Sequence, residues 1–235
     1  MRLDKFLANM GVGTRSEVKA CIRQGRVTIN GERAKKPEQK VSEDTDCVCV
    51  DGQEIHFTEM QYLMLNKPQG VVTATEDREH KTVLDLIDSP MKKQLFPVGR
   101  LDKDTEGLLL ITNDGVLAHE LLSPKKHVKK NYYAKIDGKV TEQDIEAFKN
   151  GLDLGDFTTM PAVLKILSQG DCSEIFVEIC EGKFHQVKRM FEAVGKKVTY
   201  LKRVSMGTLC LDEKLQPGEW RGLTDKELEG LKKGK

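Results

Sequence analysis

The sequence lacks the motifs of several common enzyme classes. Its six cysteines form no Cys-x-x-Cys pair, and no cysteine–histidine spacing matches a zinc site. It also lacks the phosphate-binding P-loop and the glycine motif of dinucleotide-binding folds. We therefore expect no metal ion and no nucleotide or redox cofactor.

Long hydrophobic runs are also missing. No apolar stretch approaches the roughly 18 residues of a membrane span, and the chain opens on Met1-Arg2-Leu3-Asp4 without the features of a signal peptide. Cysteines without pairing patterns and without an export signal are typical of a reducing compartment. These features predict a cytoplasmic protein that does not enter a membrane.

The chain has almost no excess of one charge, because 38 basic and 37 acidic residues leave a net charge of +1. The basic residues are nevertheless clustered. Residues 1–40 hold ten Lys or Arg against four acids, residues 125–135 hold five Lys and no acid, and residues 183–203 hold seven basic residues against one Glu. Each cluster alone is consistent with a solvated surface, but three together indicate a polyanion-binding track.

Residues 1–58 are predicted to form a small separate domain. The apolar residues of a first helix recur at helical spacing: Leu3, Phe6, Leu7 and Met10. Thr14 and Glu17 form a capping-box pair that begins a second helix, which is expected to end at Gly25. The dipeptides at 30–31 and 51–52, Asn-Gly and Asp-Gly, predict turns between short strands.

Residues 59–235 are predicted to form a second domain, after a linker at 56–61. The apolar patterns predict strands at 62–65, 71–75, 108–111, 131–137, 162–167, 174–180, 198–205 and 208–212. They predict helices at 82–87, 116–122, 141–150, 185–194 and 224–232. Because strands and helices do not alternate strictly, we expect an α+β domain with a mixed, mainly antiparallel sheet.

The segment 99–115 carries the most informative motif. Asp102 follows Arg100 and precedes a buried apolar strand, which an Asn-Asp-Gly turn at 113–115 then closes. An Arg–Asp ion pair on a loop is the simpler interpretation, but a carboxylate held beside a rigid strand can also act as a nucleophile or base. The whole segment resembles the catalytic signature of the RNA pseudouridine synthases, and most closely their ribosomal small subunit branch. The resemblance implies that Asp102 is the essential residue and that the central sheet carries a cleft across its middle.

The first domain is similar to the S4 RNA-binding domain, on the segments Arg-Leu-Asp-Lys-Phe-Leu at 2–7 and Arg-Val-Thr-Ile-Asn-Gly at 26–31. In that family the two helices and the adjoining loop present basic residues to structured RNA. The residues expected to carry this contact are Arg2, Lys5, Arg15, Lys19, Arg23 and Arg26. An ordinary solvated face remains the alternative for this stripe.

Three further segments fit the pseudouridine synthase family. Residues 66–70 fit the loop after the first strand of the catalytic domain. Residues 130–133 fit the strand of the active-site tyrosine, which aligns with Tyr132, whereas Tyr133 should face the opposite side. In residues 181–191 the family's basic residue, which pairs with the catalytic carboxylate, aligns with Lys188, and its pocket-wall residue aligns with Val187.

Two arginines complete the expected site. By resemblance, Arg100 occupies the gap that a flipped base leaves in the RNA. Successive helical residues diverge by about 100°, so it is difficult for both Lys188 and Arg189 to face the pocket. The alternative role for this basic helix is phosphate contact, which is expected of Arg189. Which of Lys188 and Arg189 faces inward stays open at this point.

The resemblances imply an enzyme that isomerises one uridine of 16S ribosomal RNA to pseudouridine, uridine 516 in the family's usual numbering. The expected partner is 16S RNA or an early small-subunit ribonucleoprotein, bound by a monomer. Three alternatives remain. They are a synthase acting on 23S RNA, an inactive RNA-binding assembly factor, and a glycoside hydrolase that uses Asp102 with Glu106.

Overall fold

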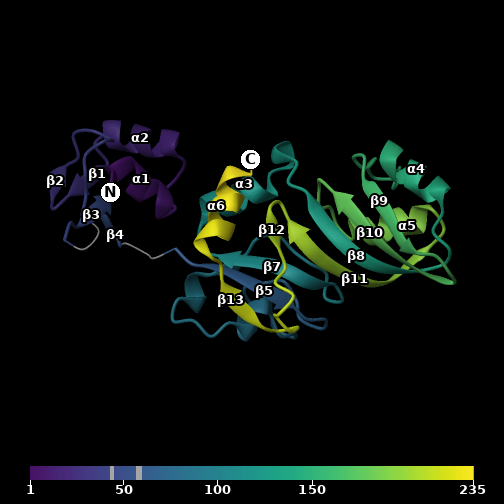
Figure 1. Ribbon diagram of the computed structural model, residues 1–235. Helices are drawn as coiled ribbons and strands as arrows, with labels where there is room; N and C mark the ends of the chain where they lie inside the picture. Colours follow the sequence, from purple (N-terminus) through teal and green to yellow (C-terminus); the bar gives the residue numbers. More distant parts are fainter. Residues whose placement is uncertain (43–44, 57–59, 235) are drawn as a thin grey trace. The chain divides into compact units, whose positions relative to one another are not determined.

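The computed structural model describes residues 1–42, 45–56 and 60–234 (Figure 1). The chain divides into two compact units, residues 1–61 with 114–119 and residues 62–113 with 120–235. The linker predicted at 56–61 lies partly outside the described residues. Each unit has its own hydrophobic core, so each is described by itself.

The first unit packs two helices on a small sheet. The helices are α1 (Leu3–Asn9) and α2 (Arg15–Arg23), and the strands are β1 (Val27–Ile29), β2 (Glu32–Arg33), β3 (Val48–Val50) and β4 (Gln53–Ile55). The strands pair antiparallel in the order β2-β1-β3-β4. The predicted apolar stripe of α1 is confirmed, since Leu3, Phe6 and Leu7 are buried in this core.

The local signals of the first unit also form as predicted. The Thr14 side chain accepts a hydrogen bond from the Glu17 amide, and the Glu17 carboxylate accepts one from the Thr14 amide. Asn30 and Gly31 both have positive φ, 52° and 85°, which is the geometry of a type I′ hairpin turn between β1 and β2.

The second unit is built on one large sheet. Its strands are β5 (Tyr62–Lys67), β6 (Phe96–Pro97), β7 (Glu106–Thr112), β8 (Lys130–Asp137), β9 (Val163–Ser168), β10 (Cys172–Ile179), β11 (Lys197–Met206), β12 (Leu209–Cys210) and β13 (Trp220–Gly222). The main path runs β13-β5-β7-β11-β8-β10-β9, with β12 on β11 and β6 on β7. The β7–β11 pair is parallel and the other pairs are antiparallel. The predicted mixed, mainly antiparallel sheet is therefore confirmed.

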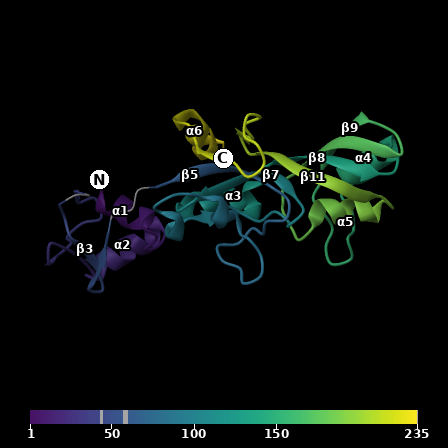
Figure 2. The same ribbon diagram turned by 90° about the horizontal axis from the view of Figure 1, so that it is seen from below.

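Helices cover both faces of this sheet (Figure 2). The α-helices are α3 (Gly115–Leu122), whose residues fall in both units, α4 (Glu142–Asn150), α5 (Gln186–Ala193) and α6 (Asp225–Lys233), with 3-10 helices η1 (Val83–Leu86), η2 (Lys92–Gln94) and η3 (Pro124–Lys126). Phe148 of α4 and Phe191 of α5 pack with ring centroids 4.9 Å apart, in the same core as Leu109 and Ile111 of β7. Helix α6 contacts β12 on the other face.

Two sequence predictions are wrong in this unit. Residues 71–75 form no strand, because the Thr73 hydroxyl donates to the Leu101 carbonyl at 2.7 Å and accepts from the Leu101 amide, which ties this segment to a loop. The Asn-Asp-Gly segment does not simply close a turn. The Asp114 carboxylate accepts a hydrogen bond from the Leu117 amide and starts helix α3.

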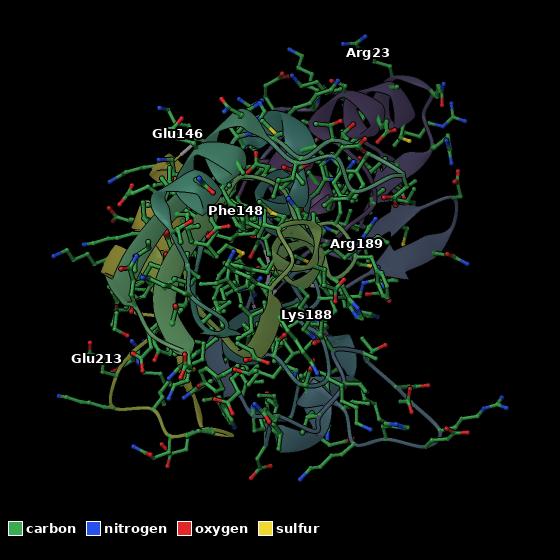
Figure 3. The ribbon with its side chains drawn as sticks, turned by 90° about the vertical axis from the view of Figure 1, so that its right-hand side faces the viewer. Arg23, Glu146, Phe148, Lys188, Arg189 and Glu213 are labelled. Carbon is green, nitrogen blue, oxygen red and sulfur yellow. The ribbon has the colours of Figure 1, made fainter. Side chains whose placement is uncertain are left out.

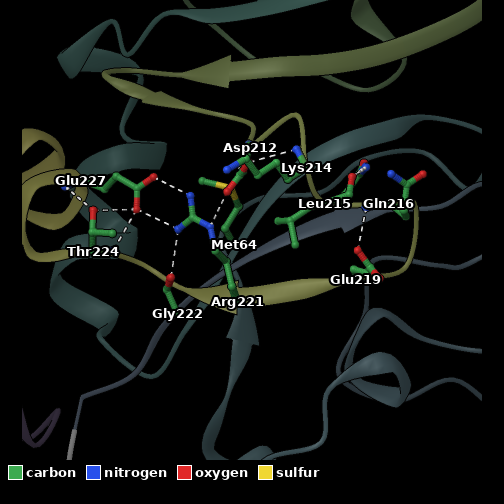
Figure 4. A network of polar contacts seen from close by, with 11 residues as sticks. Met64, Asp212, Lys214, Leu215, Gln216, Glu219, Arg221, Gly222, Thr224 and Glu227 are labelled. Atoms are coloured by element: carbon green, nitrogen blue, oxygen red, sulfur yellow. Dashed lines mark hydrogen bonds and ion pairs between the residues drawn. The ribbon is translucent and has the colours of Figure 1, made fainter.

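A polar network fixes the C-terminal segment (Figure 4). The Arg221 guanidinium donates two hydrogen bonds to the Glu227 carboxylate, at 2.9 and 2.8 Å, and one to Asp212 at 2.8 Å. Glu227 also accepts hydrogen bonds from the Thr224 amide and hydroxyl at the start of α6. Chiefly because of Arg221, the pKa of Glu227 falls to about 2, and the network joins β13 to α6.

Candidate active site

Lys67, the last residue of β5, holds the loop that carries Asp102. Its side chain is fully buried, and the Nζ donates to the carbonyls of Asp102 at 3.0 Å, Lys103 at 3.3 Å, Thr105 at 2.9 Å and Pro68 at 3.1 Å. Burial lowers the pKa of Lys67 to about 8, against the opposing effect of nearby carboxylates. Sequence reasoning placed Lys67 in a loop and gave it no role; the available signal was a lysine ending a buried apolar strand.

The other end of the loop is fixed by the approach of β7 to β11. A Cβ on Gly107 would lie 2.2 Å from the Arg203 carbonyl oxygen, so only glycine allows the two parallel strands to meet here. The Arg203 Nε donates to the Leu108 carbonyl at 2.8 Å across the same junction. Asp102 therefore lies on a loop that is anchored on both sides.

Asp102 pairs with Lys188 of α5. The Lys188 Nζ lies 3.0 Å from the Asp102 Oδ2 and 2.6 Å from the Asp104 Oδ1. Burial acts to lower the pKa of Lys188, but its contacts with the two carboxylates outweigh burial and raise it. The pKa of Asp104 is lowered, since the contacts with Lys188 outweigh the effect of its burial. The sequence analysis did not single out Asp104, which shares the ammonium with Asp102.

The neighbouring Arg189 points elsewhere (Figure 3). Its guanidinium forms an ion pair with Asp156, donates to the Leu154 carbonyl at 3.0 Å, and lies 5.2 Å from the ring centroid of Phe157. The structure thus brings Lys188, and not Arg189, to Asp102. The guanidinium expected to contact phosphate is already engaged within the protein.

A small pocket of about 50 Å³ lies beside Asp102. Its walls include Tyr132, Val187, Ile179 and Leu201, and Arg100 also lines it. The Tyr132 side chain is buried, which places an aromatic ring and a carboxylate in one cavity. Four of the residues predicted for the site therefore come together here: Arg100, Asp102, Tyr132 and Val187.

Tyr133 lies on the opposite face of β8, as expected. Its ring makes edge contacts with Phe176 and Tyr200, with centroids 5.9 and 6.0 Å apart. The Tyr200 hydroxyl in turn donates to the Glu106 carboxylate at 2.6 Å. Glu106 is therefore held by a tyrosine on β11, which argues against the two-carboxylate arrangement of a glycoside hydrolase.

The six basic residues of the first unit that are predicted to contact RNA divide into two groups. Arg2 pairs with Asp4, and Arg26 forms a two-point contact with Asp51. Lys5, Arg15 and Arg23 are exposed, and Lys19 is half-buried. Among the described residues, those exposed side chains form no ion pair, so their charge is available to a polyanion.

Two absences concern the described residues. No group of three or more His, Cys, Asp or Glu side chains in residues 1–42, 45–56 and 60–234 is arranged to hold a metal ion. In the same residues, no helix combines the length and apolar character needed to cross a bilayer.

Comparison with known proteins identifies both units. A model of the S4 domain matches residues 1–47, and a model of the RNA pseudouridylate synthases matches residues 61–193. The matches define the class first: an enzyme that acts on RNA and carries a separate RNA-binding domain. The chain belongs to the RNA pseudouridine synthase family.

Full-length relatives agree with this assignment. The chain is 50% identical over 231 residues to an uncharacterized RNA pseudouridine synthase of Bacillus subtilis, covering 97% of each chain. It is 43% identical over 236 residues to the ribosomal small subunit pseudouridine synthase A of Haemophilus influenzae, covering 99% of this chain and 100% of the relative. A crystal structure of a pseudouridylate synthase matches with a TM-score of 0.72 and 41% identity, covering 98% of this chain and 99% of the other.

Proposed function

We propose that this enzyme converts a single uridine of 16S ribosomal RNA to pseudouridine, at uridine 516 in the family's usual numbering. The observation that carries the proposal is the Asp102–Lys188 pair beside a pocket walled by Tyr132 and Val187. The choice of the small subunit is supported by relatives named as ribosomal small subunit enzymes, at 40–43% identity.

The reaction rearranges bonds within one nucleotide. The N1–C1′ bond breaks, the uracil rotates, and a C5–C1′ bond forms, while C5 loses a proton and N1 gains one. No external group enters, so a carboxylate with its counter-charge is the main chemical requirement. We assign that role to Asp102, whose counter-charge is the Lys188 ammonium 3.0 Å away, whether the carboxylate attacks C1′, adds to the ring or removes a proton on a glycal route.

Tyr132 is assigned to the uracil itself. A base inside folded RNA must leave its stack to reach an enclosed carboxylate, and an aromatic ring in the pocket can then stack on it. The Tyr132 hydroxyl can also assist removal of the C5 proton. Arg100, which is exposed at the rim of the pocket, is assigned to the gap that the base leaves behind.

The S4 domain is assigned to choosing the RNA. A pocket that reads a flipped uracil distinguishes little of the surrounding sequence, so contacts with distant RNA structure must select the site. Lys5, Arg15 and Arg23, which form no ion pair among the described residues, supply the charge for this on α1 and α2, together with the half-buried Lys19. We propose a boundary between the domains at residues 58–59 and a monomeric cytoplasmic enzyme that binds 16S RNA or an early small-subunit particle.

The test incubates the purified enzyme with naked 16S RNA, partial small-subunit particles and 23S RNA. Pseudouridine is then mapped by carbodiimide-dependent stops in primer extension. One new stop in 16S RNA is expected. A stop in 23S RNA alone would move the enzyme to the large-subunit branch, and binding without any stop would favour an assembly factor. Sedimentation of the free enzyme tests the monomer.

A further inference from the structure

Phe184 is the most exposed large apolar side chain in the part of the chain that the structure describes. Its side chain is 73% exposed. The others are aliphatic: Val116, Leu122, Val163 and Leu167. An aromatic ring so open to solvent adds little to the core, so its position calls for a different role.

The Phe184 ring lies next to the pocket. It stacks on the His185 imidazole, with centroids 3.8 Å apart and planes at 15°. His185 lines the pocket, and its Nε2 is 3.6 Å from the Asp102 Oδ1. One face of the Phe184 ring is therefore covered by His185, and its high exposure leaves the other face open to solvent. His185 contacts both this ring and the Asp102 carboxylate.

The turn that carries Phe184 is held in place. Gln186 is buried, its Oε1 accepts from the Lys183 amide at 3.0 Å, and its Nε2 donates to the Glu181 carboxylate at 2.8 Å. His185 has a φ of 50°, an uncommon conformation for a residue with a side chain. The exposed ring is thus presented by a fixed turn, and a fixed aromatic surface loses little entropy on binding.

A nearby aromatic residue offers a contrast. The Lys183 Nζ lies 3.7 Å from the Phe157 ring centroid, and the Arg189 guanidinium lies 5.2 Å from it. Phe157 is thus covered by cations, whereas Phe184 is open. Arg100 and Lys183 both line the pocket, and among the described residues neither forms an ion pair with a carboxylate, so positive charge for phosphate contacts lies at the pocket.

We propose that Phe184 binds RNA by stacking its open face on a nucleobase next to the target uridine. The identity of that RNA rests on the proposed function. The pocket of about 50 Å³ is well below the 300–1,000 Å³ of typical ligand sites, so contacts at its rim must hold the nucleotides on either side of the uracil. The Phe184 ring, which stacks on the pocket residue His185, supplies such a contact at the rim.

The test compares Phe184→Ala, Phe184→Leu and Phe184→Trp with the wild-type enzyme. Equilibrium binding and single-turnover pseudouridine formation are measured on 16S RNA, and binding also on a single-stranded polyuridine oligonucleotide over a range of salt. Loss of one stacked base is expected to weaken binding by Phe184→Ala about tenfold. The slope of log affinity against log salt stays unchanged, because no charge is lost. Phe184→Trp, which keeps an aromatic ring, is expected to bind as tightly as the wild-type enzyme, whereas Phe184→Leu is expected to bind as weakly as Phe184→Ala.

Leu167→Ala is the matched control, since Leu167 is an exposed apolar residue on the edge strand β9 and should have no effect. Binding by Phe184→Ala within twofold of wild type, or full recovery by Phe184→Leu, would overturn the inference. The proposed function fails separately, if the wild-type enzyme forms no pseudouridine in 16S RNA. In that case binding to the oligonucleotide still tests whether Phe184 stacks on a base.

Discussion

The triplet Arg-Leu-Asp occurs twice in this chain, at 2–4 and at 100–102, and the two copies have different environments. In the first, the Arg2 guanidinium donates to both Asp4 oxygens, at 3.0 and 2.8 Å, and Asp4 is buried in α1. In the second, no ion pair among the described residues joins Arg100 to Asp102. Asp102 instead pairs with Lys188 from α5 and stays partly open to a pocket.

The difference lies in the source of the counter-charge, which separates a carboxylate paired inside the fold from one that faces a pocket. Asp4 has its cation within its own triplet, so the pair is complete at the start of α1, between the N-cap residue Arg2 and the first turn. Asp102 receives its cation from a distant element, and Arg100, which forms no ion pair among the described residues, lines the pocket. The same three residues therefore give a helix-stabilising pair in one unit and an assembled site in the other.

The largest expected effect comes from substituting the two carboxylates in turn. We expect Asp102→Asn to lower the rate of pseudouridine formation by at least about 10³-fold, because the amide lacks the charge and nucleophilicity of the carboxylate. Asp4→Asn should leave the single-turnover rate at saturating enzyme nearly unchanged. Single-turnover assays on 16S RNA make the comparison, and a fully active Asp102→Asn enzyme contradicts the proposed mechanism.

The next effect concerns the counter-charge. Lys188→Met should lower the rate by about 10- to 100-fold, because two adjacent carboxylates, Asp102 and Asp104, then lose their shared cation. Arg189→Met should change the rate less than threefold, since it removes a contact with Asp156 outside the pocket. Single-turnover assays on 16S RNA compare the rates of the two variants. If the two effects are reversed, the pairing in the structure does not govern catalysis.

A smaller effect is expected in the stability of the first unit. The hydrogen bond from Arg2 lowers the pKa of Asp4 below its usual 3.8, against the effect of burial. A lowered folded-state pKa means that the carboxylate stabilises the fold fully above about pH 3.8 and loses this contribution as the pH falls through the folded-state value.

Asp4→Asn should therefore destabilise the first unit by about 1–2 kcal/mol at pH 7. The difference in the free energy of unfolding between the wild-type protein and Asp4→Asn should narrow below pH 3.8. Urea denaturation followed by circular dichroism at several pH values measures it. A gap that does not depend on pH would mean that packing, and not charge, accounts for the loss.

The smallest effect separates paired from unpaired cations. Arg23→Gln should reduce the slope of log affinity against log salt by about 0.7–0.9 for the phosphate contact it loses, since Arg23 is exposed on α2. Arg26→Gln should leave the slope unchanged, because Arg26 is already paired with Asp51. Salt titrations on 16S RNA provide the test, and equal slopes for both variants would mean that this face of α2 does not contact RNA.

Local patterns predicted much of the fold. The capping box of Thr14 and Glu17, the Asn30–Gly31 turn and the apolar strand at 108–111 depend on neighbouring residues, and all three are present. The segment 71–75 was wrongly predicted as a strand because its hydrogen-bond partner, Leu101, is distant in sequence. Alternation of apolar residues cannot reveal which loop a side chain will bind.

The site was predictable where the family motif extends and not beyond it. Asp102, Tyr132, Val187 and Lys188 come together as the motif implies. Lys67 and Asp104 received no role because each acts through a contact that closes only in three dimensions: four carbonyls around one ammonium, and a shared cation. The pairing of Arg26 with Asp51 was missed for the same reason.

The junction of β7 and β11 also has a consequence for biosynthesis. The hydrogen bond from Arg203 to Leu108 spans 95 positions of the chain, whereas the core of the first unit closes within the first 55 residues. Contacts between distant residues form late in folding, because the intervening chain must first be ordered. At about 5–20 residues per second, a nascent chain contains every residue of this first core on the order of ten seconds before β11 has been synthesised. The core of the S4 domain is therefore able to form before the sheet that anchors the Asp102 loop is complete.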